Sequence, residues 1–296
     1  MNDRASKTAV DVLAARAINT IAPKRRRIIR DPFAVGFLPF LWFIPKLFIR
    51  MGAYLPLNFY ISNLCSEFVG IGGATMVALR HRYIDDRLLE AHARGIRQVV
   101  ILGAGYDSRA CRMKLAGTSF VEVDHPRTQK EKMRNLLKRH RSLPEGITLI
   151  PVDFRDDWVS ALIASGAVRD EPAFFIWEGV SYYLPEEAIR GTLAGIAKIA
   201  PKGSGLIFDN YPKEIINPNT KDRYMKKTRV YGLRRGEPFL WGCDRDELRK
   251  LLEEHGYSDI TITTMKEFAI RLKSEEGLSF RVKDIYKYMH ISEARV

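Results

Sequence analysis

The stretch Val99-Val100-Ile101-Leu102-Gly103-Ala104-Gly105-Tyr106-Asp107-Ser108-Arg109 combines a short apolar run with two closely spaced glycines. Residues 98–102 have the length and composition of a buried strand. Glycine has no Cβ, so Gly103 and Gly105 let the backbone turn tightly and approach a ligand closely. A G-x-G pattern by itself is weak evidence. Here it joins a predicted strand to a predicted helix, so the stretch predicts the first strand and the ligand-binding turn of an α/β sheet.

Downstream of this stretch, short apolar runs alternate with segments of helical periodicity. The further predicted strands are 119–123, 148–152, 173–177 and 205–208, and the predicted helices between strands are 128–139, 158–164 and 186–200. A helix over 244–255 and two more strands, 260–264 and 268–272, follow. This alternation predicts right-handed βαβ units. We therefore expect an α/β, Rossmann-like fold of the class I methyltransferase type, with a seven-stranded, mostly parallel sheet and helices on both faces.

The character of the chain changes near residue 97. We predict a helical N-terminal cap or lid over residues 1–96 and a Rossmann-like domain over residues 97–296, with an irregular, basic insertion at about 211–242. Within the cap, Ala9, Val12, Leu13, Arg16 and Ala17 recur at helical spacing, and Asp31-Pro32 resembles the start of a helix.

Acidic residues follow three of the predicted strands, where ligands of open parallel sheets bind. Asp124 ends the second strand about twenty residues after the glycines, where a carboxylate can accept both ribose hydroxyls. Asp124 could instead cap the helix that follows His125-Pro126. Asp153 and Glu178 hold the corresponding places after the third and fourth strands.

Departures from the dinucleotide pattern separate two cofactor classes. A nicotinamide fingerprint requires a third glycine where this chain has Ser108, because that glycine allows close packing beside the pyrophosphate. S-adenosylmethionine has no pyrophosphate. Its ribose, adenine amine and amino-acid moiety explain the extra strand-end acids, so we predict S-adenosyl-L-methionine as the cofactor, bound around Gly103, Ala104 and Gly105.

Three segments together resemble the leucine carboxyl methyltransferase family, which also includes bacterial polyketide carboxyl methyltransferases. These segments are Leu102-Gly103-Ala104-Gly105-Tyr106-Asp107-Ser108-Arg109, Glu122-Val123-Asp124-His125-Pro126 and Glu178-Gly179-Val180-Ser181-Tyr182-Tyr183-Leu184. The resemblance covers most of the chain. It implies that Gly103, Asp124 and Glu178 contact the cofactor and that Asp153 and Phe154 flank its adenine.

The same resemblance implies that Arg80 pairs with the methionine carboxylate of the cofactor and that Lys7 also contacts the cofactor. The alternative for Arg80, and for Arg82, is a surface ion pair with Asp85 or Asp86. The departures from the family pattern are Arg80-His81, where many bacterial members have Arg-Thr, and Ser108 within Asp-Ser-Arg, where they have Asp-Thr-Arg.

Methyl transfer is an in-line displacement with a neutral leaving group, so the protein mainly aligns the reactants. We therefore predict an O-methyltransferase acting on a carboxylate of a small molecule, which is anionic and needs no general base. The alternative acceptor is a hydroxyl of a natural product or lipid, for which a base would help. No catalytic residue or metal site is predicted. Four residues are candidates to line the acceptor pocket, and the aromatic ones could equally belong to the core: Arg109, Tyr182, Tyr183 and Tyr211.

The formal net charge of +13 attracts anionic partners without selecting one. A basic run, Lys24 to Arg27 with Arg30, precedes an aromatic stretch, so segment 24–49 could be a solvated basic turn before a buried helix, a lid over an apolar pocket, or a peripheral membrane contact. A membrane-surface or nucleic-acid binding protein is the alternative class, but no nucleic-acid motif is present. Three cysteines and the lack of a secretory signal predict a cytoplasmic location.

Overall fold

A parallel sheet with one antiparallel strand organises the described part of the chain. The computed structural model describes residues 7–38, 73–140, 145–153 and 157–296. Within these ranges, seven strands form one sheet in the order β3-β2-β1-β4-β5-β7-β6. The strands are β1 (Gln98–Leu102), β2 (Ser119–Asp124), β3 (Ile147–Pro151), β4 (Ala173–Trp177), β5 (Gly205–Asn210), β6 (Ser258–Thr264) and β7 (His290–Arg295). Only β7 runs antiparallel to its neighbours. The predicted fold class is confirmed.

The last predicted strand is wrong. Residues 268–272 lie in helix α12 (Met265–Glu276), and the seventh strand is instead 290–295. The buried side chains of α12 are Met265, Phe268, Ala269 and Leu272, which is helical spacing, and Ile270 is exposed. Thr264 and Glu267 form a capping box at the start of the helix. This local signal outweighs the β-forming composition of the apolar run.

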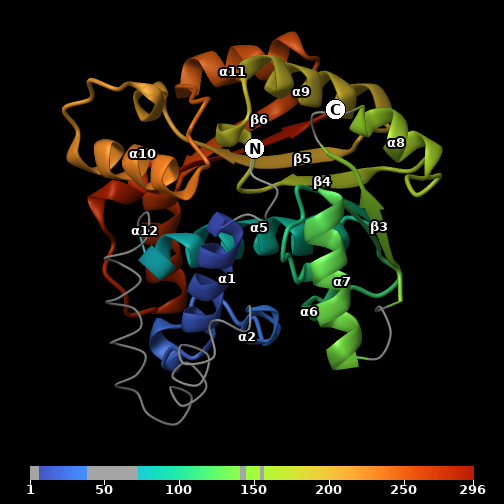
Figure 1. Ribbon diagram of the computed structural model, residues 1–296, viewed down its shortest axis with the longest axis horizontal. Helices are drawn as coiled ribbons and strands as arrows, with labels where there is room; N and C mark the ends of the chain where they lie inside the picture. The colour runs from blue at the N-terminus through green and yellow to red at the C-terminus, as the bar shows by residue number, and fades with distance from the viewer. Residues whose placement is uncertain (1–6, 39–72, 141–144, 154–156) are drawn as a thin grey trace.

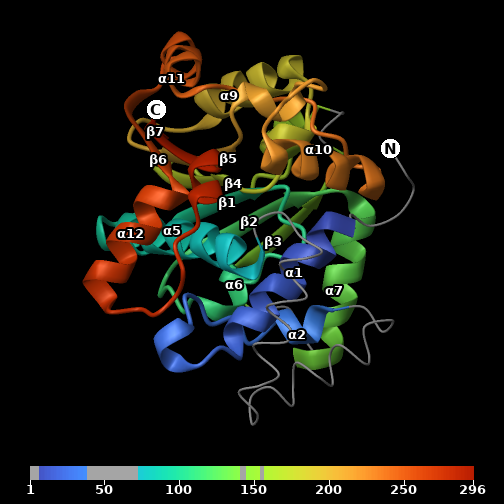
Figure 2. The same cartoon turned by 90° about the vertical axis from the view of Figure 1, so that its left-hand side faces the viewer.

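Helices cover both faces of the sheet (Figures 1 and 2). Alternate strand residues divide between two cores because successive side chains point to opposite faces. Val99 and Ile101 pack in the core that includes α5 (Gly73–Ala93) and α12, and Val100 and Leu102 pack in the other. The second core includes α8 (Trp158–Ala164), α9 (Glu186–Ile199) and α11 (Arg245–Glu254). Helix α5 therefore covers the sheet although it precedes residue 97.

A third apolar cluster joins the N-terminal segment to the sheet. It contains Leu13 of α1 (Lys7–Thr20), Phe37 of α2 (Ala34–Phe37), and Leu136 of α7 (Pro126–His140). Tyr106, directly after the glycine pair, also lies in this cluster. The N-terminal helices are thereby packed onto the turn after β1. Before α2, the Asp31 carboxylate accepts hydrogen bonds from the amides of Phe33 and Ala34, as the sequence suggested for a helix start.

The segment expected to be irregular, 211–242, contains helical structure. It includes η4 (Lys213–Ile216) and α10 (Arg223–Arg235), whose first turn is capped by the Asp222 carboxylate. The remaining short helices are η1 (Lys24–Arg26), α6 (Arg109–Arg112), η3 (Ser181–Tyr183) and η5 (Asp284–Tyr288). None of the helices in the described ranges has the length and hydropathy that a membrane span requires.

A buried ion pair between α7 and β2 generates a stability prediction. The Lys132 ammonium pairs with the Glu122 carboxylate, and both side chains are almost completely buried. Lys132→Met leaves the Glu122 carboxylate buried without its cation, so we expect the free energy of unfolding to fall by about 3–5 kcal/mol in urea denaturation. Lys130→Met, on the exposed face of the same helix, should change it by no more than about 0.5 kcal/mol. Equal effects of the two variants would contradict the pairing.

Candidate functional site

The predicted site residues gather at the carboxyl edge of β1 and β4. These neighbouring strands flank the point where the strand order reverses, since the chain runs outward through β2 and β3 and then returns to β4. Gly103 follows β1 and Glu178 follows β4. Open α/β sheets bind their ligands at this point. The fold therefore brings together residues that are more than seventy positions apart in the sequence.

The turn after β1 requires its glycines. Gly103 has a φ of +68° and Gly105 a φ of +49°, in the left-handed region that favours glycine. A Cβ on Gly103 would lie 2.3 Å from Cγ2 of Val180, so the turn also packs closely against the segment after β4. The amides of Gly103 and Ala104 donate to the Val123 carbonyl at 2.8 and 3.2 Å. The end of β2 thus holds the glycine turn in place.

Asp124 supports this turn with its side chain. Its carboxylate accepts hydrogen bonds from the backbone amides of Gly105 and His125. Burial raises the pKa of Asp124, although both amides act in the opposite direction. The partly buried carboxylate therefore orders the glycine turn and the start of α7, and the capping alternative raised by the sequence is realised in part.

Glu178 is the most heavily compensated acid of the site. Its Oε1 atom lies 2.7 Å from Nε of Arg80 and 2.9 Å from Nδ1 of His81, and its Oε2 atom lies 2.8 Å from Nη1 of Arg109. Burial by itself would raise the pKa of Glu178, but His81, Arg109 and Arg80 hold it well below its usual range. The carboxylate is therefore ionised and fixed from two directions, by α5 and by α6.

Arg80 is a buried residue and not part of a surface ion pair. Besides Glu178, its Nη1 atom donates to Oδ2 of Asp209 at 2.9 Å and to the Tyr182 hydroxyl at 3.2 Å. Arg82 does take the surface alternative, with its Nε atom 2.7 Å from Oδ1 of Asp86. The buried guanidinium of Arg80 thus joins the ends of β4 and β5.

Arg109 lies among carboxylates, apart from the tyrosines with which it was grouped. It is completely buried and bonds to Asp85, Asp107 and Glu178. In the structure it therefore holds acids in place, and contact with an acceptor would require Arg109 to be uncovered.

Tyr182, Tyr183 and Tyr211 do lie together. The ring centroids of Tyr182 and Tyr211 are 5.2 Å apart, and Phe239, which the sequence did not single out, stacks on Tyr182 at 5.3 Å. We name these four residues the aromatic cluster. It lies next to Arg80, through the bond to the Tyr182 hydroxyl.

The remaining predicted cofactor residues are Asp153, Phe154 and Lys7. Asp153 follows β3 and is partly exposed, with its Oδ2 atom 3.7 Å from Nε2 of His125. Its position at the strand end agrees with the predicted place beside Asp124. Phe154 and the side chain of Lys7 lie outside the described residues.

Comparison with known proteins identifies the family. The sequence profile of the leucine carboxyl methyltransferase family matches residues 9–197, which is more than half of the chain. The chain belongs to the leucine carboxyl methyltransferase family. A relative from Mycobacterium sp. (strain JLS) is 32% identical over 295 residues, covering 94% of this chain and 92% of the relative, and one from strain KMS is 35% identical over 296 residues with the same coverage. Both are named "Putative S-adenosyl-L-methionine-dependent methyltransferase".

A solved structure supports the fold. The protein of the DUF574 family from Streptomyces avermitilis superposes with a TM-score of 0.56 at 14% identity, and the match covers 95% of this chain and 96% of that one. The predicted family and the predicted Rossmann-like fold are both confirmed.

The residues of this family member fit the cofactor that the sequence suggested. The glycine turn brings backbone close to the strand edge without a Cβ, and Asp124 and Asp153 are only partly buried there. Nη2 of the buried Arg109 has no hydrogen-bond partner among the described residues. Carboxylates at these strand ends match the ribose hydroxyls and the adenine amine of S-adenosylmethionine, and Nη2 of Arg109 would bind its amino-acid carboxylate only if Arg109 were uncovered.

Several polar members of the site were not predicted from the sequence. Asp209 directly follows the predicted strand 205–208, although β5 itself extends to Asn210, so the strand-end rule that found Glu178 would have found it as well. Arg16 occurs in the apolar stripe of α1, and an arginine in such a stripe is itself a signal of a buried partner. The sequence contains no comparable signal for His81 and Asp85. Their roles depend on which side chains from other elements pack against α5, and this is decided only by the fold.

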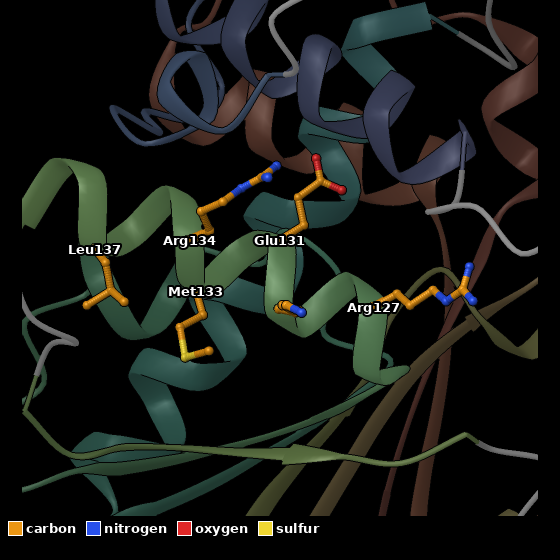
Figure 3. A pocket seen from close by; sticks show the side chains of 6 residues that line it. Arg127, Glu131, Met133, Arg134 and Leu137 are labelled. Carbon is orange, nitrogen blue, oxygen red and sulfur yellow. The ribbon is translucent and has the colours of Figure 1, made fainter.

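A hollow lies along α7 (Figure 3). Its described lining comes from one helix and mixes cationic and apolar side chains: Arg127, Lys130, Glu131, Met133, Arg134 and Leu137. None of the predicted cofactor residues is among these described lining residues, although Glu131 and Arg134 interact with Tyr106 after the glycine turn.

Cofactor binding and helix capping by Asp124 can be separated by mutation. We expect Asp124→Ala to weaken binding of S-adenosylhomocysteine by roughly 1.5–3 kcal/mol in calorimetry, because charge-assisted hydrogen bonds to the ribose are lost. Asp157→Ala removes the exposed cap of α8 after the neighbouring strand, and it should lower stability without changing affinity. If Asp124→Ala also left affinity unchanged, Asp124 would be a capping residue only.

Proposed function

We propose that the protein transfers the methyl group of S-adenosyl-L-methionine to a carboxylate oxygen of a small-molecule acceptor. Family membership and the named relatives support the coarser statement, that the chain is an S-adenosylmethionine-dependent methyltransferase. The choice of a carboxylate rests on one observation. None of the tyrosines of the aromatic cluster is available as a general base.

The tyrosines of the aromatic cluster remain protonated. Burial raises the pKa of Tyr182, Tyr183 and Tyr211, and the neighbouring Asp209 raises that of Tyr182 further. Both ring nitrogens of His81 already have partners, and burial lowers its pKa. A hydroxyl acceptor would need a base to remove its proton, whereas a carboxylate is ionised from about pH 5 upward. The groups present therefore favour the anionic acceptor.

Helix α10 supplies positive charge beside the aromatic cluster. Residues 223–235 carry six Lys or Arg side chains and no acid. The helix packs against Phe239, because a Cβ on Gly232 would lie 2.9 Å from the Phe239 ring. It also reaches α1, where Nη2 of Arg235 lies 2.7 Å from Oδ2 of Asp11. A cationic helix next to an aromatic surface suits an acceptor with an apolar body and a carboxylate.

In this proposal the cofactor supplies an electrophilic methyl group on a sulfonium. The protein aligns that group with the acceptor, since a neutral thioether leaves without protonation. Glu178, Asp124 and the glycine turn position the cofactor, while the aromatic cluster excludes water and orients the acceptor. Fixed alignment of this kind, rather than acid–base chemistry, is the main contribution we assign to the chain.

The pH dependence of the reaction tests the acceptor class. For a carboxylic-acid acceptor, we expect the rate of methyl transfer to stay flat between about pH 6 and pH 9, because the carboxylate is already ionised. The measurement is a radiolabelled methyl-transfer assay on matched pairs of acids and their corresponding alcohols. The labelled product should release methanol in alkali, as an ester does. Transfer to the alcohol, with a rate that rises with pH, would instead establish the hydroxyl alternative.

Exposed cations near η1 support a second proposal, which concerns a membrane surface on which the enzyme would encounter its acceptor. Lys24, Arg25 and Arg30 are all exposed, around η1 and before α2. The aromatic part of segment 24–49 beyond residue 38 lies outside the described residues. We propose that these three cations contact an anionic lipid surface, which would serve an enzyme with an apolar acceptor. Each Lys or Arg near such a surface contributes about 1 kcal/mol.

Vesicle binding tests this contact. We expect sedimentation with phosphatidylserine-containing vesicles at low salt and its loss at about 0.5 M salt, where charges are screened within a few ångströms. The triple variant Lys24→Ser/Arg25→Ser/Arg30→Ser should bind roughly a hundredfold more weakly. A control, Arg223→Ser/Lys226→Ser/Lys227→Ser, removes three exposed cations from α10. Equal losses in both triples would show attraction by net charge alone and would refute a local contact.

A further inference from the structure

We propose that Arg16 and His81 are positioning residues that hold the two halves of the cofactor site in register. One half is the glycine turn after β1, and the other is Glu178 after β4. We name Arg16, His81 and Glu178 the positioning relay. The inference rests on the proposed function in one respect, the contact of Glu178 with the cofactor.

The partners of His81 determine its protonation. Its Nδ1 atom lies 2.9 Å from Oε1 of Glu178 and 3.1 Å from the carbonyl oxygen of Val77. Both oxygens only accept, so Nδ1 carries the hydrogen. Its Nε2 atom lies 3.4 Å from Nη1 of Arg16, which only donates, so Nε2 presents a lone pair. His81 is therefore neutral, in the Nδ1–H tautomer.

Arg16 extends the relay to the other half of the site. From α1, its Nη2 atom donates to the Tyr106 carbonyl at 2.6 Å, and Tyr106 directly follows Gly105. Its Nε atom lies 3.4 Å from Oδ2 of Asp31, which balances the charge. One guanidinium thus contacts the glycine turn directly and Glu178 through His81.

The charges around His81 maintain the neutral form. Burial lowers its pKa, and Arg16 from α1 and Arg109 from α6 lower it further, whereas Glu178 after β4 acts in the opposite direction. Asp85, on the same helix as His81, also interacts with it. Protonation would direct an N–H of His81 toward the Arg16 cation. The relay therefore persists above the lowered pKa and breaks when the pH falls below it.

Loss of His81 should affect the cofactor more than the fold. Glu178 keeps two cationic partners, Arg80 and Arg109, so its buried charge remains compensated. What is lost is the bond that ties its orientation to α1. A positioning role therefore predicts weaker cofactor binding in a folded protein.

Two substitutions separate the two ring nitrogens. The amide nitrogen of His81→Asn can occupy the place of Nδ1 and donate to Glu178, whereas the amide of His81→Gln reaches the place of Nε2. Each variant keeps one contact of the relay and loses the other. In calorimetry with S-adenosylhomocysteine, we therefore expect both variants to bind about tenfold more weakly, the equivalent of one hydrogen bond to a charged group. His92→Asn, near the end of α5 where Nδ1 contacts Thr118, is the matched control and should have no effect.

The pH dependence and the tautomer complete the test. Affinity of the parent protein should fall on acidification, and His81→Asn, which cannot titrate, should lack that fall. Nitrogen-15 NMR of labelled histidine should show the Nδ1–H tautomer of His81 at neutral pH. An Nε2–H tautomer, or parent-like affinity of either variant, would overturn the proposal. If the parent bound no S-adenosylhomocysteine, the proposed function would fail, and the tautomer would still decide whether the relay exists.

Discussion

The Glu178 carboxylate imposes the constraint on which the rest of the site depends. A buried carboxylate is costly unless cations and hydrogen-bond donors surround it. Arg80 and His81 reach it from α5, and Arg109 reaches it from α6. The two arginines need further acids of their own, which Asp209 provides for Arg80, and Asp85 and Asp107 for Arg109. The result is a buried polar network that fixes α5, α6 and the ends of β4 and β5 relative to one another.

The network also explains why the N-terminal helices belong to the working enzyme. Arg16 of α1 joins the network through His81 and the Tyr106 carbonyl, and the apolar contacts of Leu13 and Phe37 hold α1 and α2 beside that turn. At its other side, α1 meets α10 through Asp11 and Arg235. Helices α1 and α10 thus connect the place proposed for the cofactor to the place proposed for the acceptor. In a reaction that depends mainly on alignment, this connection is the most direct contribution that packing can make.

Charge is distributed unevenly between the places proposed for the cofactor and for the acceptor. Ionised acids compensated by arginines surround the place proposed for the cofactor, whereas protonated tyrosines and a cationic helix surround the place proposed for the acceptor. Under the proposed function, such a division favours an acceptor that arrives with its negative charge already formed, because the protonated tyrosines would not generate that charge.

The sequence by itself determined the α/β fold class, the five alternating strands and the family. It also determined the strand-end residues Gly103, Asp124 and Glu178, because all these features are local. Apolar runs, glycines and acids at run ends are visible within a few residues. It misassigned 268–272, where helical capping outweighed strand composition, and it missed α10 within 211–242. Only the tertiary structure decided that Arg80 is buried, that Arg109 bonds to three acids, and that His81 lies between Arg16 and Glu178. The partners of those side chains come from segments far apart in the chain, and the folded sheet alone brings them within hydrogen-bond distance.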